Sequence, residues 1–278
     1  GAFLNTALVS VSMPKVTEIG EGAFLNTALV SVSMPKVTDI GVGAFKYCTA
    51  LTNVTMPNVE TIGAFAFLST ALVSVSMPKV TEIGNSTFYG CTALESVTMP
   101  KVTEIGNNAF YECNALESVD MPKVTSIGES AFQNTGLTTV DMPNVTSIGN
   151  IAFYGCTALE SVNMPNVTTI ENIAFIGCSA LDKVTMPKVI TIGEGAFQDC
   201  TALESVTMPL VETIGNDAFY GCTALTSVNI PVVQSIGKDA FQGTRIFQKR
   251  PCGNAMLSSC SGESVQNIVE YTKQIHKC

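Results

Sequence analysis

A unit of 21 or 22 residues repeats along most of this 278-residue chain, and its clearest copy spans residues 94–113 (LESVTMPKVTEIGNNAFYEC). One Phe marks each unit, at Phe3, Phe24, Phe45, Phe67, Phe88, Phe110, Phe132, Phe153, Phe175, Phe197, Phe219 and Phe241. A fixed period of this length is typical of a solenoid, in which each unit buries its apolar side only by stacking on its neighbours. The repeat therefore predicts one domain over residues 1–243, with about 12 coils and a continuous core.

Two short extended segments are expected in each coil. Val97 and Met99 alternate with polar residues, which is the pattern of a strand with one buried face. Pro100 ends this strand because proline cannot donate a ladder hydrogen bond. Residues 102–105 form the second extended segment. Stacked coils should then pair these segments into parallel sheets.

The remainder of the coil is expected to turn and return along the back. Gly106 follows the second segment, and its place predicts a backbone with positive φ. Residues 109–113 predict one or two helical turns that carry Phe110 into the core. The fold class is therefore α/β but rich in strands, with a parallel sheet on one face and short helical turns on the other.

Seven repeat cysteines occur only in the longer units. They are Cys48, Cys91, Cys113, Cys156, Cys178, Cys200 and Cys222. Units of 22 residues read Phe-x-x-Cys-x-Ala-Leu, whereas units of 21 residues read Phe-x-x-Thr-(Ala/Gly)-Leu. We interpret the cysteine as the residue that short units lack, and the thiols as free, buried and dispensable small apolar groups.

The pattern Leu-x-x-Val-x-Met-Pro-x-Val-Thr-x-Ile-Gly-x-x-Ala-Phe-x-x-Cys resembles the BspA-like class of leucine-rich repeat from residue 1 to about 243. It departs in its frequent Met before Pro, its shorter unit and the absence of an Asn after the strand. The resemblance implies a right-handed, curved leucine-rich-repeat solenoid. It also implies a cell-surface or secreted protein that binds host or matrix proteins, or that mediates adhesion.

Composition narrows the classes of partner. The net charge is −9 and the basic residues form no long run, which argues against nucleic acid because phosphate binding needs a positive face. Apolar residues never run 18 together, so no membrane span is expected. Residues 1–20 match residues 22–41 except at Glu18/Asp39, which predicts that the chain starts inside an array whose true beginning lies upstream.

The polar positions of the first strand are the candidate binding face for a protein or glycan. Its central part comprises Ser96, Thr98, Ser118, Asp120, Thr139, Asp141, Ser161, Asn163, Lys183 and Thr185. The plain alternative is a solvated face without a ligand. Hydroxyl columns also suit an ice-binding solenoid, although two acids and a lysine interrupt them.

Metal, cofactor and catalytic signals are weak. Asp120, Asp141 and Asn163 should stack on adjacent coils, and oxygen ligands suit Ca²⁺, but three ligands are too few for a closed site. No cofactor is predicted. The single histidine, His276, has no nucleophile or metal-ligand pattern beside it, so we predict a protein that is not an enzyme.

Possible covalent modifications fall on the repeats and the tail. Asn-x-Ser/Thr sequons begin at Asn53, Asn85, Asn144 and Asn166 and permit glycosylation in a eukaryotic secretory pathway. Cys252, Cys260 and Cys278 are disulfide candidates in an oxidising compartment. Residues 244–278 predict a C-terminal cap in which residues 263–277 form an amphipathic helix.

Two functions follow from these features. The first is an extracellular or cell-surface repeat scaffold for adhesion or for recognition of a protein or glycan. The alternative is a structural subunit of an extracellular fibre or coat, since the odd tail cysteine and the nearly identical N-terminal units permit self-association.

Overall fold

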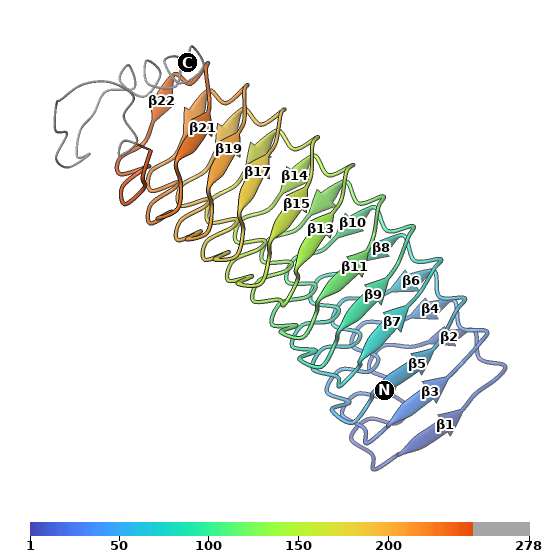
Figure 1. Cartoon of the computed structure of the whole chain (residues 1–278). Coiled ribbons are helices and arrows are strands. Elements are labelled where there is room, and N and C mark those ends of the chain that lie inside the picture. The colour runs from blue at the N-terminus through green and yellow to red at the C-terminus, as the bar shows by residue number, and fades with distance from the viewer. Residues whose placement is uncertain (247–278) are drawn as a thin grey trace, which may run out of the picture.

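The computed structural model describes residues 1–246 as a stack of coils that extends along one axis (Figure 1). Each complete coil carries one strand of three residues and one of two. The first kind comprises β1 (Ser10–Ser12), β3 (Ser31–Ser33), β5 (Asn53–Thr55), β7 (Ser74–Ser76), β9 (Ser96–Thr98), β11 (Ser118–Asp120), β13 (Thr139–Asp141), β15 (Ser161–Asn163), β17 (Lys183–Thr185), β19 (Ser205–Thr207) and β21 (Ser227–Asn229). The repeat thus builds a parallel β-solenoid, as expected.

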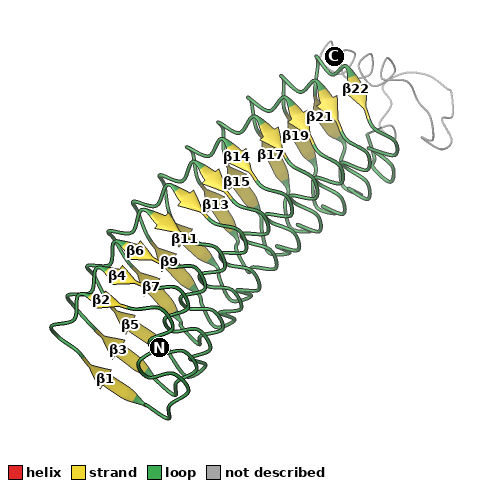
Figure 2. Ribbon diagram, turned by 180° about the vertical axis from the view of Figure 1, so that it is seen from behind, coloured by secondary structure: helices red, strands yellow, loops and turns green. Residues whose placement is uncertain are grey.

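The second kind of strand lies on another side of each coil (Figure 2). It comprises β2 (Glu18–Ile19), β4 (Asp39–Ile40), β6 (Thr61–Ile62), β8 (Glu82–Ile83), β10 (Glu104–Ile105), β12 (Ser126–Ile127), β14 (Ser147–Ile148), β16 (Thr169–Ile170), β18 (Thr191–Ile192), β20 (Thr213–Ile214) and β22 (Ser235–Ile236). Both predicted extended segments are therefore confirmed.

Equivalent residues of successive coils pair in parallel. Val97, for example, lies opposite Val75 on one side and Val119 on the other. Hydrogen bonding between the three-residue strands is interrupted between β5 and β7, between β11 and β13, and between β15 and β17. The first two interruptions occur where a 22-residue unit precedes a 21-residue unit, so a change of coil length loosens this sheet.

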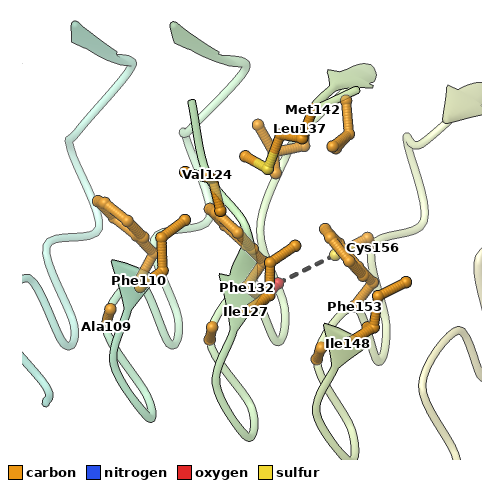
Figure 3. Close-up of a cluster of buried hydrophobic side chains, with 14 of the residues drawn as sticks. Ala109, Phe110, Val124, Ile127, Phe132, Leu137, Met142, Ile148, Phe153 and Cys156 are labelled. Atoms are coloured by element: carbon orange, nitrogen blue, oxygen red, sulfur yellow. Dashed lines mark hydrogen bonds between the residues drawn. The ribbon is translucent and has the colours of Figure 1, made fainter. Parts of the chain in front are cut away.

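A column of phenylalanine rings runs through the core. Neighbouring rings from Phe3 to Phe241 are 5.1–5.4 Å apart between centroids and nearly parallel. Figure 3 shows this stacking for Phe110, Phe132 and Phe153. Since a buried aromatic ring removes about 150–250 Å² from water, this column is a major source of stability.

The back of each coil is a series of turns, and residues 1–246 contain no helix, so the predicted helical turns are wrong. Alternate N–H groups explain this. The N–H groups of Asn108, Phe110 and Glu112 bond to carbonyls of the next coil at 2.8–2.9 Å. The N–H groups between them bond to residues three positions earlier. Half of the donors are therefore committed to the neighbouring coil, and a helix would need all of them within its own segment.

Left-handed residues make these turns possible, but not at the glycine that the sequence suggested. Gly106 has no positive φ. A glycine is needed at this position for another reason: the backbone of the preceding coil lies so close that a Cβ would be 2.8 Å from the Asn85 nitrogen. Positive φ values occur two residues before and two residues after the core Phe, as at Asn108 and Glu112.

Candidate functional site: the exposed columns

The predicted binding face is formed by the outward side chains of the three-residue strands. In the central strands β9, β11, β13, β15 and β17, the first and third residues are exposed or half-buried. The middle valine of each strand points into the core. Alternation along the strand thus places all ten predicted residues on one surface, which we call the strand face.

Most hydroxyl groups of the strand face have no hydrogen-bond partner among the described residues. Ser74, Ser96, Thr98 and Ser118 make none through their side chains. A second column of threonines, three residues after Pro in most coils, behaves differently. Several of its hydroxyls bond to the carbonyl of the preceding coil, as Thr103 does to Thr81 at 3.2 Å and Thr125 does to Thr103 at 3.1 Å. The strand-face hydroxyls therefore remain available to a ligand.

Charge changes along one edge of the strand face, at the residue just before each strand. In the N-terminal coils this position carries exposed Val9, Val30 and Val73. In later coils it carries acids, namely Glu95, Glu117, Glu160, Asp182 and Glu204. Alternation along the strand does not reveal this division, whereas the residue after each repeat Leu does. The face presents an apolar edge at one end and an acidic edge over its middle.

Asp141 and Asn163 are in direct contact, whereas Asp120 lies on the neighbouring strand beyond an interruption of the sheet. The Asn163 amide donates a hydrogen bond of 2.7 Å to Asp141 Oδ1. Within residues 1–246, no three His, Cys, Asp or Glu side chains come together in a way that suits a metal ion. The calcium hypothesis gains no further ligand from this arrangement.

The repeat cysteines are free and buried, as predicted, and they also make polar contacts between coils. Each thiol donates to the carbonyl oxygen of the Phe in the preceding coil at 2.9–3.1 Å. Figure 3 shows this bond between Cys156 and Phe132. Burial raises the pKa of the Cys91 and Cys156 thiols to about 11. These groups are polar links between coils and poor nucleophiles.

The short coils show that the missing residue was misassigned. Thr135, which follows Phe132 by three positions, occupies the cysteine column and lies 3.2 Å from Cys156 Sγ. Thr27 and Thr70 have the same relation to Cys48 and Cys91. A short coil therefore lacks the residue after the cysteine position, and its threonine takes the place of the thiol.

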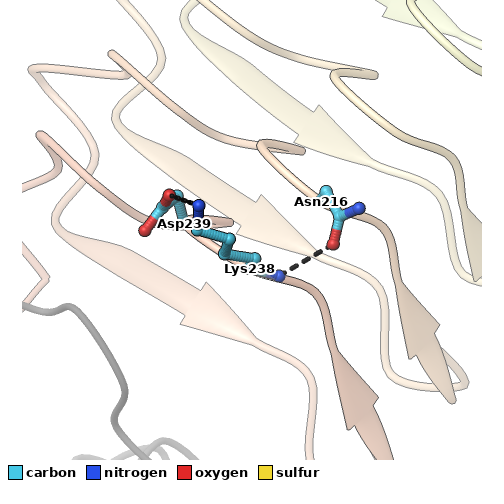
Figure 4. Close-up of polar contacts among 3 residues, drawn as sticks. All are labelled: Asn216, Lys238 and Asp239. Carbon is cyan, nitrogen blue, oxygen red and sulfur yellow. Dashed lines mark hydrogen bonds and ion pairs between the residues drawn. The ribbon is translucent and has the colours of Figure 1, made fainter.

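The predicted sequons differ in their surroundings. The side-chain amides of Asn144 and Asn166 donate to the carbonyls of Pro122 and Pro143 at 2.9 and 2.8 Å. Asn53 lies on the exposed side of β5. Asparagines at the turn after the second strand accept hydrogen bonds from the backbone of the next coil. Asn85 Oδ1 accepts the N–H of Asn107, and Asn216 Oδ1 accepts that of Lys238 at 2.9 Å (Figure 4).

The comparison with protein families agrees with this geometry. A family model described as "BspA type Leucine rich repeat region (6 copies)" matches residues 1–95, 81–202 and 125–248. The chain belongs to the BspA-type leucine-rich repeat family. These matches together span the whole described solenoid, and members of this family are repeat scaffolds that are generally non-catalytic. No curated protein sequence matches the chain.

Several solved structures are similar to this BspA-type chain. A leucine-rich repeat protein from Bacteroides ovatus is 26% identical, with 84% of each chain covered and a TM-score of 0.48. One from Eubacterium ventriosum is 26% identical over 90% of this chain and 85% of its own, with a TM-score of 0.48. A leucine rich cell surface protein from Faecalibacterium prausnitzii is 25% identical over 81% of this chain and 86% of its own, with a TM-score of 0.40.

The described part of the chain, residues 1–246, holds no helix long and apolar enough to cross a membrane. The predicted cap and its helix, the disulfide candidates Cys252, Cys260 and Cys278, and the single histidine lie outside the described residues. The last described residue, Ile246, is buried, and the N–H of Arg245 bonds to the Leu225 carbonyl at 2.9 Å. The buried core thus extends to Ile246.

Proposed function

We propose that this chain is a non-catalytic scaffold at the cell surface or outside the cell, and that its strand face recognises a protein or glycan in adhesion. The observation that carries the proposal is the contrast between the two hydroxyl columns. Several threonine hydroxyls three residues after Pro bond to the preceding coil, whereas most strand-face hydroxyls point outward without a partner among the described residues. Membership of the BspA type supports the surface location.

The composition of the strand face indicates the kind of contact. It carries serine, threonine, asparagine, aspartate and one lysine, but no aromatic residue or arginine among the described strands. Aromatic and arginine side chains dominate compact, tight protein interfaces. A face of small hydroxyls repeated coil after coil instead suits an extended ligand that makes many weak contacts and gains affinity through their number.

The test uses the full chain, coated on a surface and probed with purified matrix proteins and with a glycan array. Ser96→Arg and Ser118→Arg place bulky charge on the strand face, and Ser147→Arg is the matched control on the exposed position of β14. We expect binding of at least one probe, a loss of tenfold or more for the strand-face variants, and no change for the control. Equal binding by all three variants would refute the strand face as the recognition surface.

A further inference from the structure

We propose that Lys46, Tyr47 and Phe65 form a second docking site, on the turns at the back of two adjacent coils, for an acidic protein segment that carries an apolar side chain. The Lys46 ammonium lies 5.0 Å from the Tyr47 ring centroid and 5.4 Å from that of Phe65. The two coils are joined there by the Tyr47 N–H, which bonds to the Leu68 carbonyl at 2.8 Å. We call these three residues the aromatic–lysine cluster.

The backbone of the aromatic–lysine cluster is the first reason to look for a ligand. Tyr47 has a φ of 61° and Phe65 a φ of 60°, which is unfavourable for bulky side chains. The other coils carry Gly, Asn, Ser, Asp, Glu or Ile at these two positions, and no other aromatic residue. Backbone strain of this kind is concentrated at functional sites.

Burial does not compensate for this strain. Tyr47 is 45% exposed and Phe65 is 37% exposed, although the core phenylalanines beside them are fully buried. Val42, on the same turn as Lys46, is also 45% exposed and extends the apolar surface. Exposed aromatic side chains next to an aliphatic residue are typical of the anchor residues of a protein interface.

Charge indicates the partner. Lys46 forms no ion pair with a carboxylate in residues 1–246, and its contacts are with the faces of two rings. A cation held in this way can still accept a carboxylate, and complementary charge selects an acidic partner. An apolar side chain next to that carboxylate would pack on the rings. This site lies away from the strand face and does not depend on the function proposed above.

The experiment selects random 12-residue peptides displayed on phage against the immobilised full chain. Selected peptides are then synthesised, and their affinity is measured by fluorescence anisotropy. We expect enrichment of Asp or Glu beside Phe or Leu, and a tenfold or greater loss of affinity when the peptide acids become amides. A selection without this composition, or amide peptides that bind equally well, would overturn the proposal.

Variants of the chain separate binding from folding. Tyr47→Asn and Phe65→Gly copy the residues of neighbouring coils, Asn26 and Gly43, at the same left-handed positions. We expect each to weaken peptide binding at least tenfold while the melting temperature stays the same or rises. Ile151→Gly and Ile173→Gly, also left-handed in the native chain, are matched controls that should leave binding unchanged.

Two other results would contradict the inference. If Tyr47→Asn and Phe65→Gly bind the selected peptides as tightly as the native chain, the aromatic–lysine cluster is not the site. If the chain self-associates at micromolar concentration in sedimentation, and Tyr47→Asn abolishes that association, the occupant is a second copy of this chain and not an acidic segment.

Discussion

The long coils and the short coils enclose the same core with different residues at one corner. In a long coil a buried thiol bonds to the Phe carbonyl of the coil before it, as Cys178 does to Phe153 at 3.1 Å. In a short coil a buried threonine stands in that column, and its hydroxyl bonds to the carbonyl of its own Phe, as Thr135 does to Phe132 at 3.0 Å. Both side chains are small and carry a donor, which adds a hydrogen bond to a buried Phe carbonyl; the Phe153 carbonyl, for example, also accepts the N–H of Cys156 at 3.2 Å.

The largest effect should show that both coil types depend equally on the phenylalanine column. Phe110→Ala removes a ring from a long coil and Phe132→Ala removes one from a short coil, and both rings are fully buried. Each should lower the free energy of unfolding by about 3–5 kcal/mol, the usual cost of emptying an aromatic site. Urea unfolding followed by circular dichroism measures this loss.

Gln133→Ala is the control for the phenylalanine variants, since this half-buried side chain follows Phe132 directly and makes no hydrogen bond within residues 1–246. It should change stability by less than about 0.5 kcal/mol. A much smaller loss for Phe132→Ala than for Phe110→Ala would mean that the short coil packs its core differently, and the comparison would fail.

The next prediction uses the pH dependence of stability to distinguish a buried thiol, which ionises near pH 11, from a buried hydroxyl, which does not. Burial raises the pKa of Cys91 and Cys156 from 9.0 to about 11, so their neutral form is favoured in the folded chain. This contribution to stability is complete below pH 9 and is lost as pH rises from 9 to about 11, because the unfolded chain ionises first. Two pKa units correspond to at most about 3 kcal/mol per thiol.

Cys91→Thr should remove its share of this alkaline loss, because threonine does not ionise in that range. The measurement is the urea midpoint of the native chain and of the variant between pH 8 and pH 11. If the two midpoints fall in parallel, the Cys91 thiol does not contribute. Alkylation with mass mapping provides a second check, since these thiols should react only on unfolding.

A smaller effect tests the donor itself. Cys178→Ala removes one of two donors to the Phe153 carbonyl, which keeps the Cys156 N–H, and leaves a small void, at a cost of about 1–2 kcal/mol. Cys178→Thr places a hydroxyl in the same column, where by analogy with Thr135 it should donate to the carbonyl of its own Phe, Phe175, and this variant should cost less than half as much. Equal losses for the two variants in urea unfolding would show that volume matters at this position and hydrogen bonding does not.

The periodic part of the fold could be predicted from the sequence because the same pattern of apolar and polar positions recurs in twelve units. Val97 and Met99 could be assigned to the core from alternation alone, and both are buried. The back of the coil could not be predicted in this way. Its turns are stabilised by N–H groups that bond to the next coil, as Phe110 does to Ala131, and propensity within one segment carries no information about that partner.

The surfaces show the same division. Alternation placed Ser96 and Ser118 on the outside correctly, but it could not distinguish their unpartnered hydroxyls from the bonded hydroxyl of Thr103. The aromatic–lysine cluster was missed because Tyr47 and Phe65 lie at different positions of the repeat. The two rings belong to adjacent coils, and what they share is contact with the Lys46 ammonium.

The smallest effect concerns the left-handed turns, where coils differ in how strongly the side chain strains the backbone. Ile173 has a φ of 62°, although a β-branched side chain disfavours this conformation, while Gly195 occupies the same position in the next coil with a φ of 58°. Ile173→Gly should therefore raise the free energy of unfolding by about 0.5–1 kcal/mol, since relief of strain exceeds the added flexibility of the unfolded chain. Gly195→Ile, the reverse change one coil later, should lower it by at least as much, and both are measured by urea unfolding. A loss of stability in Ile173→Gly would mean that packing of the Ile173 side chain outweighs the strain of its backbone.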